Sequence, residues 1–159
     1  LDRAFAHFLE TIKDTDTLVV LSADHGHVNT DDGETLVLHH APGVADGLLL
    51  PLCGEPRAGY AYVQHGAHER FEDRVKNAFG DALDVVTSSQ AISDGWFGPG
   101  TPHRSFASRV GDFVLLPDAA LMVRDWLPGE RHFALQSAHG GLSSAEMRVP
   151  LVVAACGAG

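Results

Sequence analysis

A continuous apolar run, Leu18-Val19-Val20-Leu21, limits the fold of this chain more than any other stretch. With no polar residue at alternate positions, it predicts a strand over residues 17–21 that is buried on both faces. Before it, apolar residues recur with a 3.6-residue period and predict a helix over about residues 2–13. The chain enters this helix directly at Leu1, without a Met or a capping residue, and we interpret this as an internal starting point within a longer protein.

Strands and helices alternate along the rest of the chain. The helix predicted over residues 67–79 is amphipathic and stops at Gly80, a residue typical of helix ends. The other predicted elements are a short extended piece at 36–38, strands at 59–64, 83–87, 112–116, 120–125 and 149–155, and a short helix at 88–93. This alternation predicts the α/β class, and 159 residues suffice for one domain with a substantial core.

The composition disfavours several classes of function. Lys and Arg total 11 against 21 Asp and Glu, a net charge of −10, which argues against a nucleic-acid binder that neutralises phosphates. No apolar run approaches the roughly 18 residues of a membrane span. Cys53 and Cys156 lie in apolar surroundings without metal or redox spacing, so we interpret them as buried free thiols in a reducing compartment. This favours a cytoplasmic location, while a signal peptide or anchor upstream of Leu1 stays an open alternative.

Polar residues follow the apolar strand at once: Asp24, His25, Gly26 and His27. In an open α/β sheet, ligands bind beyond the carboxyl ends of the strands. Adjacent side chains converge on one ion only where a strand has stopped, and Gly26 permits the turn that follows. A carboxylate oxygen beside an imidazole nitrogen suits Zn²⁺, Mn²⁺ or Fe²⁺, although two ligands do not close a site. Local chemistry alone leaves an equal alternative, a turn with a capping carboxylate.

A second group of polar residues stands 114 positions after His25, in the stretch SAHGGLSSAEMRVPLVV, residues 137–153. His139 precedes two glycines, which allow a sharp turn or a close approach of the backbone. Ser143 and Glu146 have the spacing of a capping box, so we predict a helix cap rather than an acid–base role for Glu146. On local chemistry alone, His139 is better interpreted as a structural loop histidine than as a ligand.

Together, LSADHGHV and HGGLSSAEMRVPLVV resemble the alkaline phosphatase superfamily, and within it the type I phosphodiesterase and nucleotide pyrophosphatase family. The segments GEPR (54–57) and RVGDFVLL (109–116) lie between the motifs in the expected order, so the resemblance covers nearly the whole chain. It implies a partial alkaline-phosphatase-like α/β sheet flanked by helices. Residues 1–159 would be its C-terminal portion, with 54–136 as the segment between the two metal-ligand motifs.

The resemblance also implies a site with two divalent metal ions, Zn²⁺ or alternatively Mn²⁺. Asp24 and His25 match the adjacent ligands of one ion, and His139 matches a ligand of the other. The family's Thr or Ser nucleophile and its remaining ligands lie upstream of the matched region. No catalytic nucleophile is therefore assigned to this chain, and the chain alone is expected to be inactive. In the parent protein, one ion would lower the pKa of the nucleophile and the other would stabilise the leaving oxygen.

Other polar residues have structural interpretations. The resemblance requires no ligand at His27, which we interpret as a pocket-lining or exposed histidine. The doublet His39-His40 is interpreted as solvated. Arg57 and Arg109 are predicted to fix loops by pairing with carboxylates, such as those of Glu55 and Asp112. Contact of either arginine with phosphate is the alternative.

The expected substrate is a small phosphoester, and the resemblance favours a phosphodiester or nucleotide pyrophosphate over a monoester. Trp96 and Phe97, an aromatic pair among glycines, are candidates for stacking on a nucleobase, with a small core anchor as the alternative. Residues 24–33 contain no Lys or Arg and do contain Asp31 and Asp32, so nothing there favours a dianion pocket. Two other functions stay open: a non-catalytic binding or assembly module, and a monoesterase or phosphomutase of the superfamily.

Overall fold

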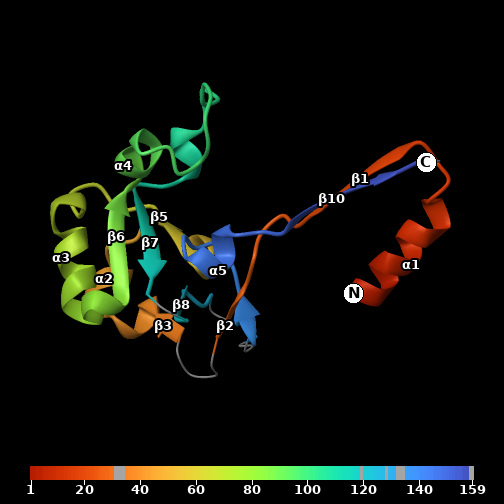
Figure 1. Cartoon of the computed structure of the whole chain (residues 1–159). Coiled ribbons are helices and arrows are strands. Elements are labelled where there is room, and N and C mark those ends of the chain that lie inside the picture. Colours follow the sequence, from red (N-terminus) through yellow and green to blue (C-terminus); the bar gives the residue numbers. More distant parts are fainter. Residues whose placement is uncertain (31–34, 119, 128, 132–134, 158–159) are drawn as a thin grey trace.

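The computed structural model describes residues 1–30, 35–118, 120–127, 129–131 and 135–157, which form a body and a projecting arm (Figure 1). The helices are α1 (Asp2–Ile12), α2 (Pro42–Ala45), α3 (His68–Phe79), α4 (Ser88–Ser93) and α5 (Ser144–Met147), with 3₁₀ turns at Leu38–His40, Gly80–Ala82 and Ala107–Arg109. The strands are β1 (Thr17–Ser22), β2 (Val28–Asn29), β3 (Thr35–Val37), β4 (Cys53–Glu55), β5 (Ala58–Ala61), β6 (Leu83–Thr87), β7 (Phe113–Pro117), β8 (Met122–Arg124), β9 (Ser137–Ala138) and β10 (Leu151–Cys156). The predicted α/β class is confirmed. No described helix is both long and apolar enough to cross a membrane.

The largest sheet of the described residues has four antiparallel strands in the order β4-β5-β7-β6. Strand β7 is apolar and almost wholly buried. Helix α3 packs against β6, and α4 packs against β6 and β7. Phe71 and Val75, one turn apart on α3, are fully buried, and the ring of Phe71 lies 5.1 Å from that of Phe113 on β7. The main hydrophobic core lies in this layer between helix and sheet.

Local sequence signals set the ends of α3 and α4. Gly80 ends α3 with a φ of +59°, a conformation that favours glycine. Thr87 caps α4, because its Oγ1 accepts the Gln90 N–H at 3.2 Å. The predicted strand 83–87 and helix 88–93 agree with β6 and α4 at both ends, and the other predicted elements lie within three residues of their observed ends.

Helix α1 and strands β1 and β10 form the arm (Figure 1). β1 pairs with β10 in an antiparallel ribbon, and no third described strand joins it. The prediction that residues 17–21 are buried is wrong: Leu18 is 66% exposed and Val20 is 59% exposed. An apolar strand is buried only where other layers cover both of its faces, and the described residues provide no such layers along this ribbon.

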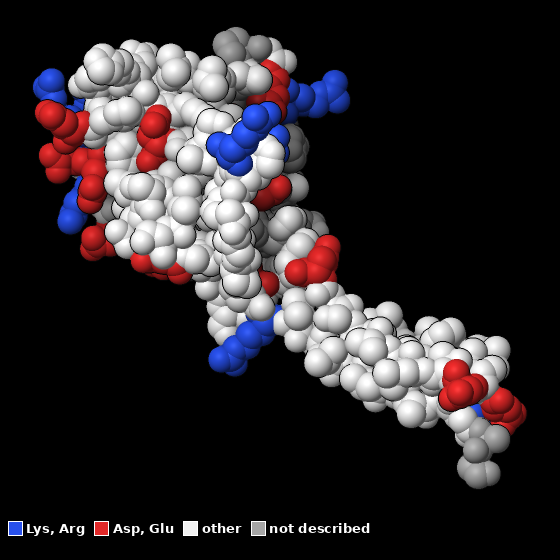
Figure 2. All heavy atoms as spheres, turned by 90° about the horizontal axis from the view of Figure 1, so that it is seen from above, with Lys and Arg blue, Asp and Glu red and all other residues white. Residues whose placement is uncertain are grey.

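One face of the ribbon is a continuous apolar strip. Leu18 and Val20 of β1 share this face with Leu151 and Val153 of β10, because alternate residues of paired strands point the same way. All four side chains are exposed. Figure 2 shows few charged side chains on the arm between the body and the tip. Exposed apolar strips of this kind favour association.

Both cysteines are free, as predicted, but the prediction that they are buried is wrong. Cys53 is exposed on β4, an edge strand of the four-stranded sheet. Cys156 is half-buried at the end of β10, in the two-stranded arm. Each strand lacks a neighbour on one side among the described residues, so apolar sequence around a cysteine does not lead to burial here.

We expect the chain to self-associate through the apolar strip of the arm. The double substitution Val20→Lys and Leu151→Lys should shift the protein toward the monomer, because burying an unpaired charge in an apolar contact costs free energy. Analytical ultracentrifugation over a range of concentrations measures this shift. Glu72→Lys, on the exposed side of α3, is the control and should leave association unchanged. A strictly monomeric unsubstituted chain would contradict the prediction.

Candidate metal centre

Strands β2 and β9 bring two histidines from distant parts of the sequence together. The strands are antiparallel, with Val28 opposite Ala138. One position further along the same register, His27 stands opposite His139. On the other side, the Thr30 N–H continues the pairing by donating to the Gln136 carbonyl at 3.0 Å. A two-strand ladder therefore joins the two sequence motifs.

His25 completes a cluster of three imidazoles. Its ring stacks on that of His139, with 3.8 Å between the centroids and 17° between the planes. The ring of His27 lies 5.1 Å from that of His25 and 5.0 Å from that of His139. One ring nitrogen from each residue lies within 4.8 Å of the others. The expected meeting of His25 and His139 is confirmed, while their role as ligands stays a prediction.

The tautomer of His25 is fixed by its own backbone. Its Nδ1 lies 2.9 Å from the Gly26 carbonyl oxygen, which only accepts hydrogen bonds, so Nδ1 carries the proton and donates. In the neutral ring, Nε2 then has a free lone pair. Metal-binding histidines are commonly oriented by a hydrogen bond of this kind from the second ring nitrogen.

Asp24 is close to this free nitrogen. Its Oδ1 accepts the His25 N–H at 3.0 Å, and its Oδ2 lies 3.5 Å from His25 Nε2. Hydrogen bonds from the backbone N–H groups of His25 and of Asp24 itself, followed by the charge of the His25 ring, lower the pKa of Asp24. The carboxylate is thus ionised at neutral pH. One oxygen accepts the backbone N–H of the turn and the other lies beside the His25 ring, so the capping role and a ligand role next to His25 are compatible.

Glu146, on α5, connects both histidine-bearing loops. Its backbone carbonyl accepts the Gly26 N–H at 2.7 Å, next to His25. Its carboxylate accepts the Gly141 N–H at 2.9 Å, two residues after His139. The carboxylate also forms a bidentate pair with Arg57, at 3.1 and 3.0 Å, and both side chains are almost completely buried. Arg57 in turn donates to the carbonyls of Pro117 and Leu121. The loops are therefore fixed to the body through one ion pair.

This pair corrects two predictions. Arg57 does pair with a carboxylate, but the partner is Glu146 rather than Glu55. The capping box does not form: Ser143 precedes α5, yet its hydroxyl donates to the Glu146 carboxylate instead of accepting a backbone N–H. The Glu146 carboxylate, which would cap a surface helix, instead pairs with the buried Arg57 guanidinium, because a buried charge without a partner strongly destabilises the fold.

The second predicted arginine pair is wrong. Among the described residues, no ion pair joins Arg109 to Asp112. Asp112 accepts the Val63 N–H at 2.8 Å and lies 3.4 Å from His68 Nε2.

The glycines of both motifs are required by close packing. A Cβ at Gly26 would lie 1.8 Å from the Ala145 carbonyl oxygen, which leaves no room for a side chain. A Cβ at Gly141 would lie 2.9 Å from a Glu146 carboxylate oxygen. Gly140 has a φ of +107°, which L-residues rarely adopt. The glycines allow α5 to approach both loops.

A hollow of about 280 Å³ opens beside the imidazoles. His25 and His139 form part of its lining, together with Tyr60, Trp96 and Phe97. Burial and then the charge of Glu55 raise the pKa of Tyr60, so its phenol stays protonated. The two aromatic residues singled out in the sequence are thus close to the predicted ligands. Trp96 is half-buried and Phe97 is 38% exposed, so neither is an ordinary core residue.

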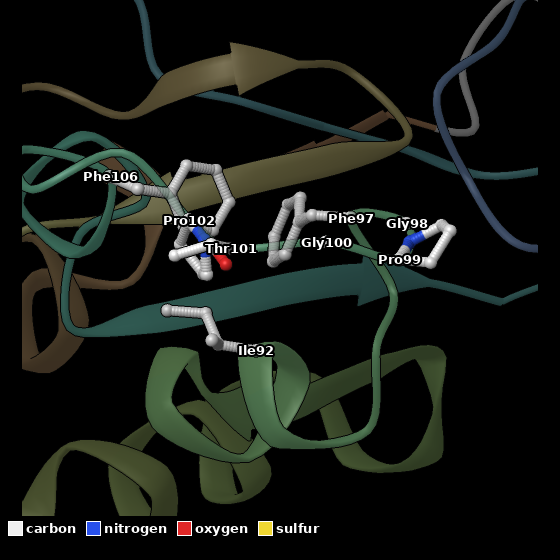
Figure 3. A pocket seen from close by; sticks show the side chains of 8 residues that line it. All are labelled: Ile92, Phe97, Gly98, Pro99, Gly100, Thr101, Pro102 and Phe106. Carbon is white, nitrogen blue, oxygen red and sulfur yellow. The ribbon is translucent and has the colours of Figure 1, made fainter.

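Phe97 also borders a second hollow, of about 230 Å³, shown in Figure 3. Ile92 of α4 lies on one side of this hollow, and Phe106, whose ring lies 5.0 Å from that of Phe97, lies on the other. Phe97 thus lines both hollows, and its contact with Phe106 helps to hold its ring in place.

Sequence reasoning missed the place of His27 in the cluster. It is exposed, as predicted, but it adjoins both predicted ligands. His25 and His27 are two positions apart, the spacing that puts side chains on one face of an extended segment, and this was the available signal. His39 and His40 are exposed, as predicted. Asp31 and Asp32 lie outside the described residues.

Glu146→Gln should lower the free energy of unfolding by roughly 3–5 kcal/mol, since it leaves the buried Arg57 charge without its partner. Urea denaturation measures the loss. Glu72→Gln, at an exposed position, is the matched control and should change stability little. Equal stability of the Glu146→Gln variant would show that the ion pair does not hold the loops.

The stability should also fall in acid. Burial raises the pKa of Glu146, but hydrogen bonds from Arg57, Ser143 and Gly141 outweigh it and bring the pKa from 4.5 to about 2. A carboxyl group with a lowered pKa contributes stability above its unfolded value, and this contribution disappears as the pH falls toward the folded value. Denaturation between pH 5 and 2 should therefore show a drop in the unsubstituted chain, and a smaller drop in Glu146→Gln.

Comparisons with solved structures support the fold. Human ectonucleotide pyrophosphatase / phosphodiesterase 5 is 14% identical, with a TM-score of 0.69. An inactive form of the murine protein in complex with AMP is 16% identical, with a TM-score of 0.68. Phosphonoacetate hydrolase from Sinorhizobium meliloti 1021, in complex with phosphonoacetate, is 21% identical, with a TM-score of 0.66. Each match covers 96% of this chain and 38% of the solved chain.

The sequence comparisons give the family. No curated protein matches this chain. The sequence profile described as type I phosphodiesterase / nucleotide pyrophosphatase matches residues 1–141, from α1 through the strand that positions His139. The chain therefore belongs to the type I phosphodiesterase / nucleotide pyrophosphatase family.

Proposed function

We propose that the protein is a metal-dependent phosphoester hydrolase and that this chain supplies part of a two-metal centre. Asp24 and His25 hold one divalent ion, and His139 holds the other. The observation that carries the proposal is the contact between His25 and His139, whose rings lie 3.8 Å apart although the residues are 114 positions apart. Family membership and the fold support the hydrolase class.

The donor set fits divalent ions. Imidazole nitrogen together with carboxylate oxygen suits Zn²⁺, with Mn²⁺ as the alternative. Two such ions supply activation of a nucleophile and stabilisation of a leaving oxygen. This chain's own residues orient the ligands: the Gly26 carbonyl holds His25 Nδ1, and Glu146 anchors the loops that follow both histidines.

We assign the nucleophile and the other metal ligands to parts of the protein outside these residues. The chain spans 38% of the length of the first solved relatives. It supplies too few ligands for two ions, so we expect the 159-residue chain alone to hydrolyse no phosphoester.

We propose a phosphodiester or nucleotide pyrophosphate as the substrate. A murine relative has been solved with AMP, and the hollow beside the histidines is lined by aromatic rings of a kind that stack on nucleobases. The residues that line this hollow include no Lys or Arg. A monoester dianion carries more charge than a diester and calls for basic groups, so the lining favours the diester.

The test uses the full-length protein that contains this chain, with Zn²⁺ or Mn²⁺. We expect a higher kcat/KM for bis-p-nitrophenyl phosphate and for p-nitrophenyl thymidine monophosphate than for p-nitrophenyl phosphate. A higher kcat/KM for the monoester would overturn the substrate assignment. Absence of hydrolysis of all three esters in the metal-loaded protein would favour the non-catalytic module.

Trp96→Ala should raise the KM for p-nitrophenyl thymidine monophosphate by about fivefold or more, since a stacked base contributes roughly 1–3 kcal/mol. Its kcat should change less, because Trp96 is not a predicted metal ligand. Trp126→Ala is the matched control, since Trp126 does not line the hollow. An unchanged KM in Trp96→Ala would remove the stacking role and leave the metal centre standing.

A further inference from the structure

The hollow shown in Figure 3 is distinct from the hollow that borders the imidazoles, and the two meet at Phe97. Phe97 is the one residue that lines both of them. None of the proposed metal ligands lines the hollow in Figure 3, which we call the outer hollow. The proposed metal centre therefore assigns no role to it.

The lining of the outer hollow carries no charge. Ile92, Phe97 and Phe106 contribute apolar side chains, and Thr101 contributes the one hydroxyl group of the lining. The loop 98–102 adds two prolines, and proline has no backbone N–H to donate. Moving a charged group into such a lining costs free energy, because the group loses water and gains no partner. The outer hollow therefore suits an uncharged, apolar group.

The wall of the outer hollow has a defined backbone conformation. Gly98 and Gly100 have φ angles of +92° and +123°, and a Cβ at either position would meet no atom within 4 Å, so both glycines serve the conformation of the loop. The Gly98 N–H donates to the Gly95 carbonyl at 3.0 Å, and the Phe106 N–H donates to the His103 carbonyl at 2.8 Å. A wall shaped in advance loses little conformational entropy when a ligand binds.

Two aromatic rings give the outer hollow a preference for flat groups. The ring planes of Phe97 and Phe106 meet at 77°, with 5.0 Å between the centroids. A flat ring that stacks on one of them lies edge-on to the other, and both arrangements are favourable between aromatic rings. An aromatic guest therefore gains more in this hollow than an aliphatic guest of the same area.

The sizes of the two hollows indicate how they act together. Pockets for complete small molecules measure roughly 300–1,000 Å³, whereas the outer hollow measures about 230 Å³ and the hollow beside the imidazoles about 280 Å³. Each therefore suits one group of a ligand. A phosphodiester carries two such groups on one phosphorus. A nucleoside triphosphate does not match, because its second group is a charged pyrophosphate for which the outer hollow has no partner.

We propose that the outer hollow binds the departing ester group of a phosphodiester and that this group is an uncharged aromatic ring. The inference rests on the proposed function and narrows its substrate class to aryl phosphodiesters. With p-nitrophenyl thymidine monophosphate, the base lies beside Trp96 and the nitrophenyl ring beside Phe106. Net hydrolysis consumes one water: the P–O bond to the nitrophenyl oxygen breaks, a P–O bond to the water oxygen forms, nitrophenolate leaves with the bonding electron pair, and the protons of the water pass to solvent.

The test compares kcat/KM for p-nitrophenyl thymidine monophosphate with kcat/KM for thymidine 5′-triphosphate in the full-length, metal-loaded protein. Both compounds contain the same thymidine monophosphoryl group and differ in the group that departs. We expect a higher value for the aryl ester. Phe106→Ala should reduce the ratio of the two values by about fivefold or more, the loss expected when a stacked ring loses its aromatic partner. Phe106→Tyr keeps the ring and should keep the ratio.

Thr101→Lys tests the charge preference without removing a buried contact, since Thr101 is exposed. The added ammonium should lower the same ratio, because it pairs with the departing pyrophosphate of the triphosphate. Asn77→Lys is the matched control: it adds the same charge at an exposed position of α3 that lines neither hollow, and it should leave the ratio unchanged. A ratio that stays unchanged in both Phe106→Ala and Thr101→Lys would overturn the inference, as would a preference of the unsubstituted protein for the triphosphate.

Binding separates this inference from the proposed function. If the full-length protein cleaves neither compound, both stay intact, and isothermal titration calorimetry gives their dissociation constants. Phe106→Ala then supports the outer hollow if it weakens binding of the aryl ester and leaves binding of the triphosphate unchanged, even though the proposed function has failed. Absence of binding of the aryl ester overturns the inference. Cleavage of both compounds with equal losses in Phe106→Ala keeps the proposed function and overturns the inference.

Discussion

The ion pair between Arg57 and Glu146 is the interaction on which the candidate metal centre depends. It is almost completely buried, and among the described residues each side-chain nitrogen of Arg57 and each carboxylate oxygen of Glu146 has a hydrogen-bond partner. Arg57 belongs to the turn between β4 and β5, while Glu146 belongs to α5, and the two residues are 89 positions apart. A buried pair of this kind contributes little net stability compared with apolar residues, but it fixes geometry, because each charge tolerates only the arrangement that satisfies it. Here the arrangement that it fixes is the approach of α5 to the loops after His25 and His139.

The site itself is built on very short pairings. β2 and β9 contribute two residues each, whereas the strands of the main sheet have three to five. Such a short ladder is weak alone, so the anchoring of Gly26 and Gly141 by Glu146 gives the loops a second point of attachment. The glycines are what make this approach possible, since a single added Cβ at Gly26 would collide with the backbone of α5. Charge, packing and backbone conformation thus act together on the position of three imidazoles.

The hollow that contains Trp96 and Phe97 adjoins the imidazoles, so a ligand at the candidate centre would have these rings beside it. His25 and His139 border the hollow, whereas Trp96 and Phe97 reach it from the loop after α4. The ring of Phe97 makes an edge-to-face contact with that of Phe106 (Figure 3). Imidazoles beside a largely apolar lining that includes three aromatic side chains are an arrangement that can hold a charged group and an adjoining flat group at the same time.

The sequence by itself determined the local elements and the identity of the two motifs. The 3.6-residue period and the glycine after α3 are local signals, so α3 was predicted close to its observed ends, as were β6 and α4. The sequence also singled out Asp24, His25 and His139 as candidate ligands, because these residues lie within recognisable motifs. Only the tertiary structure decided the burial of β1, the partner of Arg57 and the neighbours of His27. Each of these depends on which distant segment lies alongside, and a register between strands more than 100 positions apart leaves no trace in the local pattern of either strand.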